Sequence, residues 1–75
     1  MLHPIIEEVW TTGADPKPLR RARIKDARDG WNAAYERARE LAAHFDESDF
    51  VHDEQHSYAW GRNKDSRATY RYIVK

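Results

Sequence analysis

Two histidines with acidic residues between them form the only grouping in the sequence whose spacing suits a metal ion. His52 and His56 are four residues apart, as two ligands on one helical turn would be, and Asp53 and Glu54 lie between them. The order His-x-Glu-x-His differs from the His-Glu-x-x-His of zinc proteases. A closed structural zinc site needs four ligands, and no distal ligand completes this group. We therefore predict a solvated acidic loop without metal or cofactor, with metal binding as the alternative that a zinc titration would test.

A basic segment, residues 17–28, could contact phosphate groups. It contains six Lys and Arg residues and one acid, Asp26. If the segment is a strand, Arg21, Arg23 and Lys25 project from one side as a row that could bind phosphates. A charged sheet edge that blocks pairing with other sheets is the alternative.

An acidic segment, residues 46–54, contains five carboxylates and no Lys or Arg. The whole chain has 13 Lys and Arg against 13 Asp and Glu, so the formal net charge is zero. Such blocks of opposite sign predict distinct basic and acidic surface regions. A non-specific nucleic-acid binder would normally have a clear positive excess.

Four aromatic residues near the C-terminus could stack on nucleic-acid bases if they lay on an exposed sheet face. They are Tyr58, Trp60, Tyr70 and Tyr72, and they lie close to Arg62, Arg67 and Arg71. A chain of 75 residues has a small core and needs these rings inside it. We therefore predict that an apolar helix face covers all four of them.

The sequence lacks the groups that usually carry out catalysis. It has no Cys, no Gly-x-Ser-x-Gly motif and no glycine-rich phosphate loop. Glu7 and Glu8 are adjacent, so on a strand they would point to opposite faces and could not act as an acid–base pair. We therefore predict that the protein is not an enzyme.

No apolar run approaches the ~20 residues of a membrane span, and the N-terminus lacks the pattern of a secretory signal. We therefore expect a cytoplasmic protein that does not enter a membrane, and a single domain over residues 1–75.

The element expected to organise the chain is an amphipathic helix over residues 29–45. Its apolar residues recur at spacings of three and four and so share one face: Trp31, Ala34, Tyr35, Ala38, Leu41, Ala42 and Phe45. Asp29 is the expected N-cap, because its carboxylate can accept an unpaired backbone N–H. The acidic run after Phe45 is unfavourable at the negative end of the helix dipole, so the helix should end there.

A first strand is expected over residues 4–12, which are rich in β-branched and aromatic types. Ile5 and Val9 would share one face, and Ile6 and Trp10 the other. A bulge at Glu7–Glu8 is an alternative explanation of the imperfect alternation.

The remaining segments predict the rest of a sheet. Residues 19–25 fit a short strand hairpinned to the first, with a helix as the alternative. Residues 57–62 and 67–74 alternate well and flank a polar turn, as in a hairpin. Residues 46–57 are polar apart from Phe50 and Val51, which should lie under the helix end. The predicted class is α+β: a two-layer domain with an antiparallel sheet of three to four strands and one helix, in the order β-β-α-β-β or β-α-β-β.

This outline resembles small α+β proteins encoded by phages and mobile elements, anti-CRISPR proteins among them. The shared features are the length, the β–helix–β–β order, the absence of Cys and a terminal aromatic hairpin formed by residues 57–62 and 67–74. The resemblance covers the whole chain as an outline and assigns no role to an individual residue. Such proteins typically occupy a surface of a larger complex, often one that would otherwise hold nucleic acid.

The resemblance implies that charged patches contact the partner. The basic patch would bind an acidic partner, and the acidic patch would lie in a basic groove as a nucleic-acid mimic. The candidate contact residues are Arg20, Arg21, Arg23, Lys25, Arg28, Asp46, Glu47, Asp49, Asp53 and Glu54. We therefore predict a non-enzymatic protein-binding module, of the inhibitor type, whose partner is a protein or a nucleoprotein complex. The alternatives are a nucleic-acid-binding domain that uses residues 17–28 and a domain that dimerises through its sheet edge. The sequence leaves monomer and homodimer open.

Overall fold

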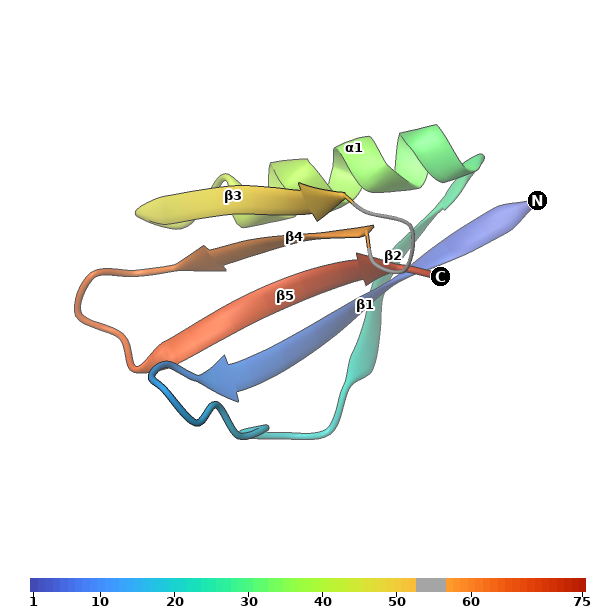
Figure 1. Ribbon diagram of the computed structural model, residues 1–75. Helices are drawn as coiled ribbons and strands as arrows, with labels where there is room; N and C mark the ends of the chain where they lie inside the picture. The colour runs from blue at the N-terminus through green and yellow to red at the C-terminus, as the bar shows by residue number, and fades with distance from the viewer. Residues whose placement is uncertain (53–56) are drawn as a thin grey trace.

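The computed structural model describes residues 1–52 and 57–75, and it contains one helix and five strands (Figure 1). The elements are β1 (Leu2–Thr11), β2 (Arg23–Asp29), α1 (Trp31–Ala42), β3 (Glu47–His52), β4 (Ser57–Arg62) and β5 (Ala68–Val74). All neighbouring strands are antiparallel, in the order β2-β1-β5-β4-β3, and α1 lies along one face of the sheet. The α+β class and the single helix across a sheet are confirmed. The sheet has five strands, so the prediction of three to four was too low.

The additional strand is β3, which the sequence analysis treated as part of a polar loop. It pairs with β4 along its whole length, from Glu47 opposite Arg62 to His52 opposite Ser57. β3 is an edge strand, and Phe50 and Val51 are its only large apolar residues. An edge strand that buries so little has no clear hydrophobic period, which explains why the sequence did not reveal it.

β1 runs between β2 and β5, and its two faces are those that the sequence predicted. Ile5 and Val9 are buried on the helix side, while Ile6 and Trp10 lie on the opposite face. The irregularity of this strand is not at Glu7–Glu8. The register with β2 shifts between Ile5 and Ile6, because Lys25 is an extra residue on β2.

The predicted apolar face of α1 packs on the sheet. Ala34, Ala38 and Ala42 are essentially fully buried, and their small side chains allow the helix to lie close to the strands. Gly61 of β4 marks the tightest approach. A Cβ there would lie 2.5 Å from the Phe45 ring and 2.8 Å from the carbonyl oxygen of Ala42, so no larger residue fits without movement.

The ends of α1 differ from the prediction. Asp29 is not the N-cap but the last residue of β2, and its carboxylate accepts a hydrogen bond from the N-terminal ammonium group at 2.6 Å. The N-cap is Gly30, whose φ of 92° is in the left-handed region that favours glycine and which provides no side-chain cap. The helix ends at Ala42, and Phe45 follows in a turn, where it stacks on Tyr70.

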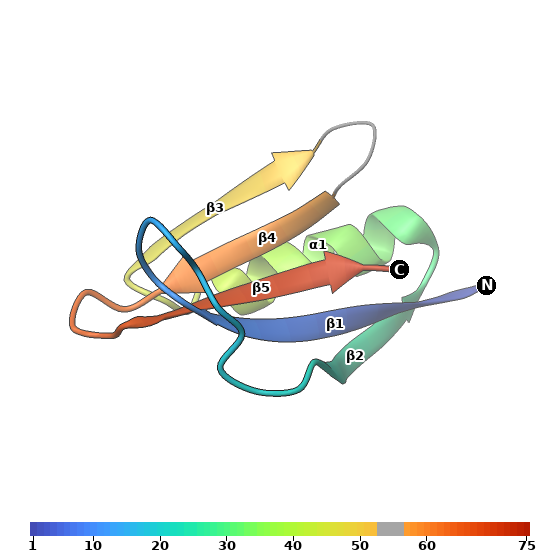
Figure 2. The same ribbon diagram turned by 60° about the horizontal axis from the view of Figure 1, so that its bottom comes forward.

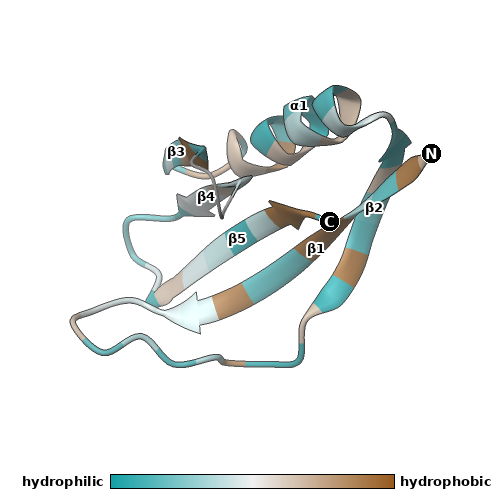
Figure 3. Ribbon diagram, turned by 45° about the vertical axis from the view of Figure 1, so that its right-hand side comes forward, coloured by the Kyte–Doolittle hydropathy of each residue, from teal (hydrophilic) through white to brown (hydrophobic). Residues whose placement is uncertain are grey.

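The ambiguous basic segment forms a strand, as favoured, but further along the chain than residues 19–25. β2 begins at Arg23 and continues to Asp29. Residues 17–19 follow β1 more loosely: Thr11 donates its N–H to Lys17, and Leu19 donates its N–H to Val9. Figure 3 shows hydrophobic and hydrophilic bands along β1 and β2. No helix in the described part of the chain has the length and apolar character needed to cross a membrane.

Candidate partner-binding surface

The C-terminal aromatic residues lie on two different faces of the sheet. Tyr70 pairs with Gly61, and Tyr72 pairs with Ala59, so both tyrosines point toward α1. Tyr58 and Trp60 alternate with Ala59 and Gly61 along β4 and therefore point to the opposite face. The prediction that the helix covers all four rings is correct for Tyr70 and Tyr72 and wrong for Tyr58 and Trp60.

We call the sheet surface opposite α1 the open face. Figure 2 views the molecule with α1 behind the sheet, and of the described chain only the β1–β2 connection passes in front. One row of cross-strand partners on this face is apolar through all five strands: Ile24, Ile6, Ile73, Tyr58 and Val51. Ile24 is 68% exposed. A continuous apolar row without a covering layer is unusual on a small protein and often marks an interaction site.

A second row beside the apolar one combines charged and aromatic residues. It consists of Glu8, Arg71, Trp60 and Asp49. The Arg71 guanidinium lies 5.0 Å from the ring centre of Trp10 and 5.6 Å from that of Tyr58, both within the range of cation–π attraction. The Trp10 indole N–H donates to Glu8 at 3.1 Å. These contacts connect Glu8, Trp10, Arg71 and Tyr58 across the open face.

A shallow depression of about 180 Å³ lies within the open face. It is lined by Tyr58, Trp60, Arg62, Thr69 and Arg71. It is smaller than the ~300 Å³ of the smallest usual small-molecule pockets. Its aromatic walls and guanidinium groups could accept an inserted side chain or a stacked ring.

The basic segment does not form the predicted row of projecting cations. Arg20 and Arg23 donate hydrogen bonds to one carboxylate oxygen of Glu7, and the Lys25 ammonium lies 4.0 Å from the other oxygen. Glu7 is only 2% exposed and lies on the helix side of β1. A buried carboxylate requires such compensation. Three of the predicted contact residues are therefore held by an internal charge.

The next basic residue is also paired within the fold. Arg28 donates to Asp26 at 2.7 Å, and Arg37 of α1 donates to the other oxygen of Asp26 at 2.8 Å. The hydrogen bond from Arg37, together with the Ala27 N–H and Arg28, lowers the pKa of Asp26 below its ordinary value. Arg21 is exposed.

The described acidic candidates are engaged locally as well. Glu47 accepts a hydrogen bond from Arg62 at 2.6 Å, and Asp46 accepts one from the Lys64 backbone at 3.0 Å. Asp49 accepts one from the Phe50 N–H at 2.8 Å. The remaining two candidates, Asp53 and Glu54, lie outside the described residues.

Of the two histidines in the alternative metal site, the structure describes His52, whereas His56 lies outside the described residues. The His52 ring packs against Trp31 and Tyr35 and lies 2.9 Å from the Ser57 hydroxyl. Within residues 1–52 and 57–75, no group of three or more His, Cys, Asp or Glu side chains is placed to hold a metal ion.

The residues that sequence reasoning missed are those of the apolar row. Ile6 and Trp10 were placed on a second face of β1, but that face was not connected with Ile24 or Ile73. The signal was present in Ile73, which alternates with Tyr72 and Val74 and so had to face away from them.

Comparison of this chain with protein-family models, with curated proteins and with solved structures gave no match.

Proposed function

We propose that the protein is a non-enzymatic protein-binding module that docks its partner on the open face of the sheet. The observation that carries this proposal is the apolar row from Ile24 to Val51, which crosses all five strands. Among the residues that the structure describes, only the β1–β2 connection passes in front of this face (Figure 2). Burying such a row against a partner removes apolar area from water at a gain of about 25 cal/mol per Å².

The composition of the open face supports a protein as the partner. Residues that dominate binding energy in protein interfaces are mainly Trp, Tyr and Arg. Here Trp60 and Arg71 lie beside the apolar row, and Arg71 is already positioned by Trp10 and Tyr58. Side chains that are ordered before binding lose less conformational entropy when the complex forms.

The charge of the open face argues against nucleic acid. Two guanidinium groups, Arg62 and Arg71, face three carboxylates, those of Glu8, Glu47 and Asp49. Nucleic-acid affinity depends mostly on neutralising phosphates with free cations. The basic segment offers few, because Glu7 and Asp26 hold most of its cations.

Single-stranded nucleic acid remains the second candidate, because three aromatic rings and two arginines share this face. Stacked bases contribute to binding even without sequence recognition. Whether the partner is a protein or a single-stranded nucleic acid, the protein would act by occupying a surface of a larger assembly. The contact would be made by the open face and not by the charged patches.

The test combines capture from a lysate of the encoding organism with an oligonucleotide binding assay. Immobilised wild-type protein is compared with Tyr58→Ala/Trp60→Ala and with the control Arg21→Ala, each with and without nuclease treatment. We expect wild type and the control to retain the same protein partner after nuclease, and the double variant to lose it. Circular dichroism melts check that each variant is folded.

The competing proposal is tested by measuring the binding of fluorescent single-stranded oligonucleotides at low salt. Binding that disappears with Trp60→Ala, together with partner capture that disappears after nuclease, would replace the protein-binding proposal with nucleic-acid binding. Capture that is equal in the double variant and in wild type would show that the open face is not the docking surface.

A further inference from the structure

The shallow depression in the open face contains cations and hydrogen-bond donors, and no carboxylate lines it among the described residues. Its lining residues are Tyr58, Trp60, Arg62, Thr69 and Arg71. They provide two guanidinium groups, two hydroxyls and an indole N–H. The described carboxylates of the open face, those of Glu8, Glu47 and Asp49, lie around the depression and not in its lining. The depression is therefore locally positive.

The two guanidinium groups of the depression are used differently. The Arg62 Nε donates to the Glu47 carboxylate at 2.6 Å, so the charge of this arginine is already balanced. Arg71 makes no ion pair among the described residues, because Glu8, its cross-strand neighbour, accepts the Trp10 indole N–H instead. The two cation–π contacts of Arg71 act on its charge and leave its N–H donors without a carboxylate. Arg71 is therefore the unbalanced charge of the depression.

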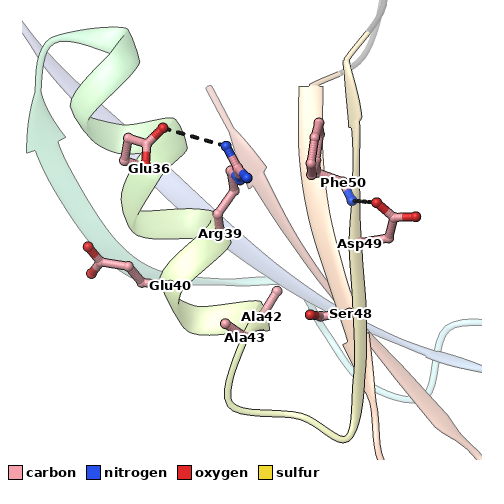
Figure 4. Close-up of a pocket in the computed structure, with 8 residues that line it drawn as sticks. All are labelled: Glu36, Arg39, Glu40, Ala42, Ala43, Ser48, Asp49 and Phe50. Atoms are coloured by element: carbon pink, nitrogen blue, oxygen red, sulfur yellow. Dashed lines mark hydrogen bonds and ion pairs between the residues drawn. The ribbon is translucent and has the colours of Figure 1, made fainter.

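The larger groove on the helix side of the sheet has no such unbalanced charge among the described residues. This groove, of about 400 Å³, lies between β3 and α1 (Figure 4). The Arg39 guanidinium lies 3.7 Å from the Glu36 carboxylate, and the side chains of Glu40 and Asp49 point away from this pair (Figure 4). The charge of the groove therefore selects no ligand, in contrast to the depression around Arg71.

The position of Arg71 suits a group that a partner inserts. β5 is the central strand of the sheet, with two strands on either side, so Arg71 lies near the middle of the open face. Residues at the centre of an interface are shielded from water and contribute most to binding. A guanidinium group can bind a carboxylate through two parallel N–H···O bonds. A depression of about 180 Å³ has room for one such side chain.

The surroundings of the depression add an apolar requirement. Tyr58 belongs both to the lining and to the apolar row, and Ile73 of the same row is its cross-strand partner. Arg71 and Ile73 are two residues apart on β5, which places their backbone positions about 7 Å apart. A protein segment with a carboxylate on Arg71 therefore also places its neighbouring side chains on the apolar row.

The carboxylates beside the depression restrict the ligand to an isolated acid. Glu8 and Asp49 flank Arg71 in the same row of the open face. A run of acids would bring further negative charges close to these two carboxylates, and so would a nucleic acid, which carries a phosphate at every nucleotide. A single carboxylate among aliphatic side chains avoids this repulsion.

We propose that the depression around Arg71 receives the carboxylate of one Asp or Glu side chain of the partner protein. Aliphatic side chains next to this acid lie on the apolar row. The proposal rests on the proposed function, because it names the chemistry that the partner presents to the open face.

The probe is a displayed library of random peptides of about twelve residues, selected on the immobilised protein. Wild type is compared with Arg71→Glu and with Arg21→Glu, which makes the same change in net charge at an exposed position outside the lining of the depression. We expect wild type and Arg21→Glu to enrich peptides with one Asp or Glu among aliphatic residues. Arg71→Glu should instead enrich peptides with Lys or Arg. Circular dichroism melts check that each variant is folded.

Fluorescence anisotropy then measures the most enriched peptide and an analogue in which the acid is replaced by its amide. We expect the analogue to bind wild type about fivefold more weakly, because it loses the ion pair with Arg71. The two peptides should bind Arg71→Gln equally. This comparison isolates the charge of Arg71, since structural damage would weaken the binding of both peptides alike.

Three outcomes would overturn the proposal. The first is that wild type enriches no peptide or shows no preference for acids, and the second is that the preference for acids persists on Arg71→Glu. The third is that a single-stranded oligonucleotide binds more tightly than the peptide and loses its affinity in Arg71→Gln, which would assign Arg71 to phosphates.

Capture from the lysate separates this proposal from the proposed function. If Arg71→Gln retains a protein partner that Tyr58→Ala/Trp60→Ala loses, the open face is the docking surface and the carboxylate proposal is wrong. If the double variant also retains the partner, the proposed function itself is wrong.

Discussion

Glu7 is the residue that determines how the basic segment is used. Its carboxylate lies on the helix side of β1, beside Tyr72 of the neighbouring strand, and it attracts Arg20, Arg23 and Lys25 from one side. Burial, and after it the interaction with Glu7, raises the pKa of Tyr72. One buried carboxylate therefore converts a basic stretch of sequence into a structural clamp that fastens the β1–β2 connection to the sheet.

The first prediction concerns this clamp. Glu7→Gln should lower the free energy of unfolding by about 2 kcal/mol, because the charged hydrogen bonds to Arg20 and Arg23 are lost. Both arginines remain partly exposed, so water can solvate them and the loss stays below that of a fully buried pair. Urea unfolding followed by tryptophan fluorescence measures the change.

Glu8→Gln is the matched control, since Glu8 is adjacent in sequence but lies on the open face. Its amide oxygen can still accept the hydrogen bond from Trp10, so we expect a change within about 0.5 kcal/mol. Equal effects of the two substitutions would show that the cations do not depend on Glu7.

At the scale of elements, Asp26 joins β2 to α1. Its carboxylate accepts hydrogen bonds from Arg37 of the helix and from Arg28 of its own strand. The Arg37 hydrogen bond is the largest of the interactions that lower the pKa of Asp26 from its ordinary value of 3.8. A carboxylate with a lowered folded-state pKa stabilises the fold above the unfolded pKa, and this contribution is lost as the pH falls through the folded pKa.

The second prediction follows from the direction of this pH dependence, in which Asp26 stabilises the fold only while its carboxylate is ionised. Wild type should be more thermally stable than Asp26→Asn near pH 6, and the difference should shrink as the pH falls below about 4. Melting temperatures between pH 6 and pH 2.5 test it. Asp15→Asn is a suitable control, because Asp15 is exposed and only 3.9 Å from Lys17, and its pH profile should follow that of wild type. A constant difference between wild type and Asp26→Asn at all these pH values would contradict the role of Asp26.

The elements that could be predicted from the sequence are those with a buried period. The face of α1 that contains Ala34 and Ala38, and the alternation of β5, follow directly from the spacing of apolar residues. The spacing of apolar residues did not reveal β3 or the bounds of β2, because edge strands bury little and carry charges on both faces. The helix start was missed because β2 continues to Asp29, so a good capping residue is used elsewhere.

The candidate surface was harder to predict than the fold. Whether Tyr58 shares a face with Tyr72 or with Ile73 depends on the register of the β4–β5 hairpin, and a shift of one residue reverses the answer. The prediction that the basic segment projects as a row of cations was wrong for a related reason. Glu7 is far from Arg20 and Lys25 in sequence, so their pairing is created only when the strands come together.

The whole molecule has one covered sheet face and one open face, and the two should contribute very differently to its stability. Ile5 and Ile24 lie on neighbouring strands, but Ile5 is 0% exposed beneath α1 and Ile24 is largely exposed on the open face. A domain of this size has only about 5 kcal/mol of stability to lose. The covered face alone should therefore support folding.

The last prediction compares these two residues. Ile5→Ala should cost about 2–5 kcal/mol and leave much of the protein unfolded, because it creates a cavity under α1. Ile24→Ala should change stability by less than about 0.5 kcal/mol, because its side chain is already in water. Chemical denaturation measures both. A large loss for Ile24→Ala would mean that the open face is covered in the free protein by a second copy, which light scattering would detect as a dimer. The apolar row would then be an interface between copies rather than a surface available to a partner.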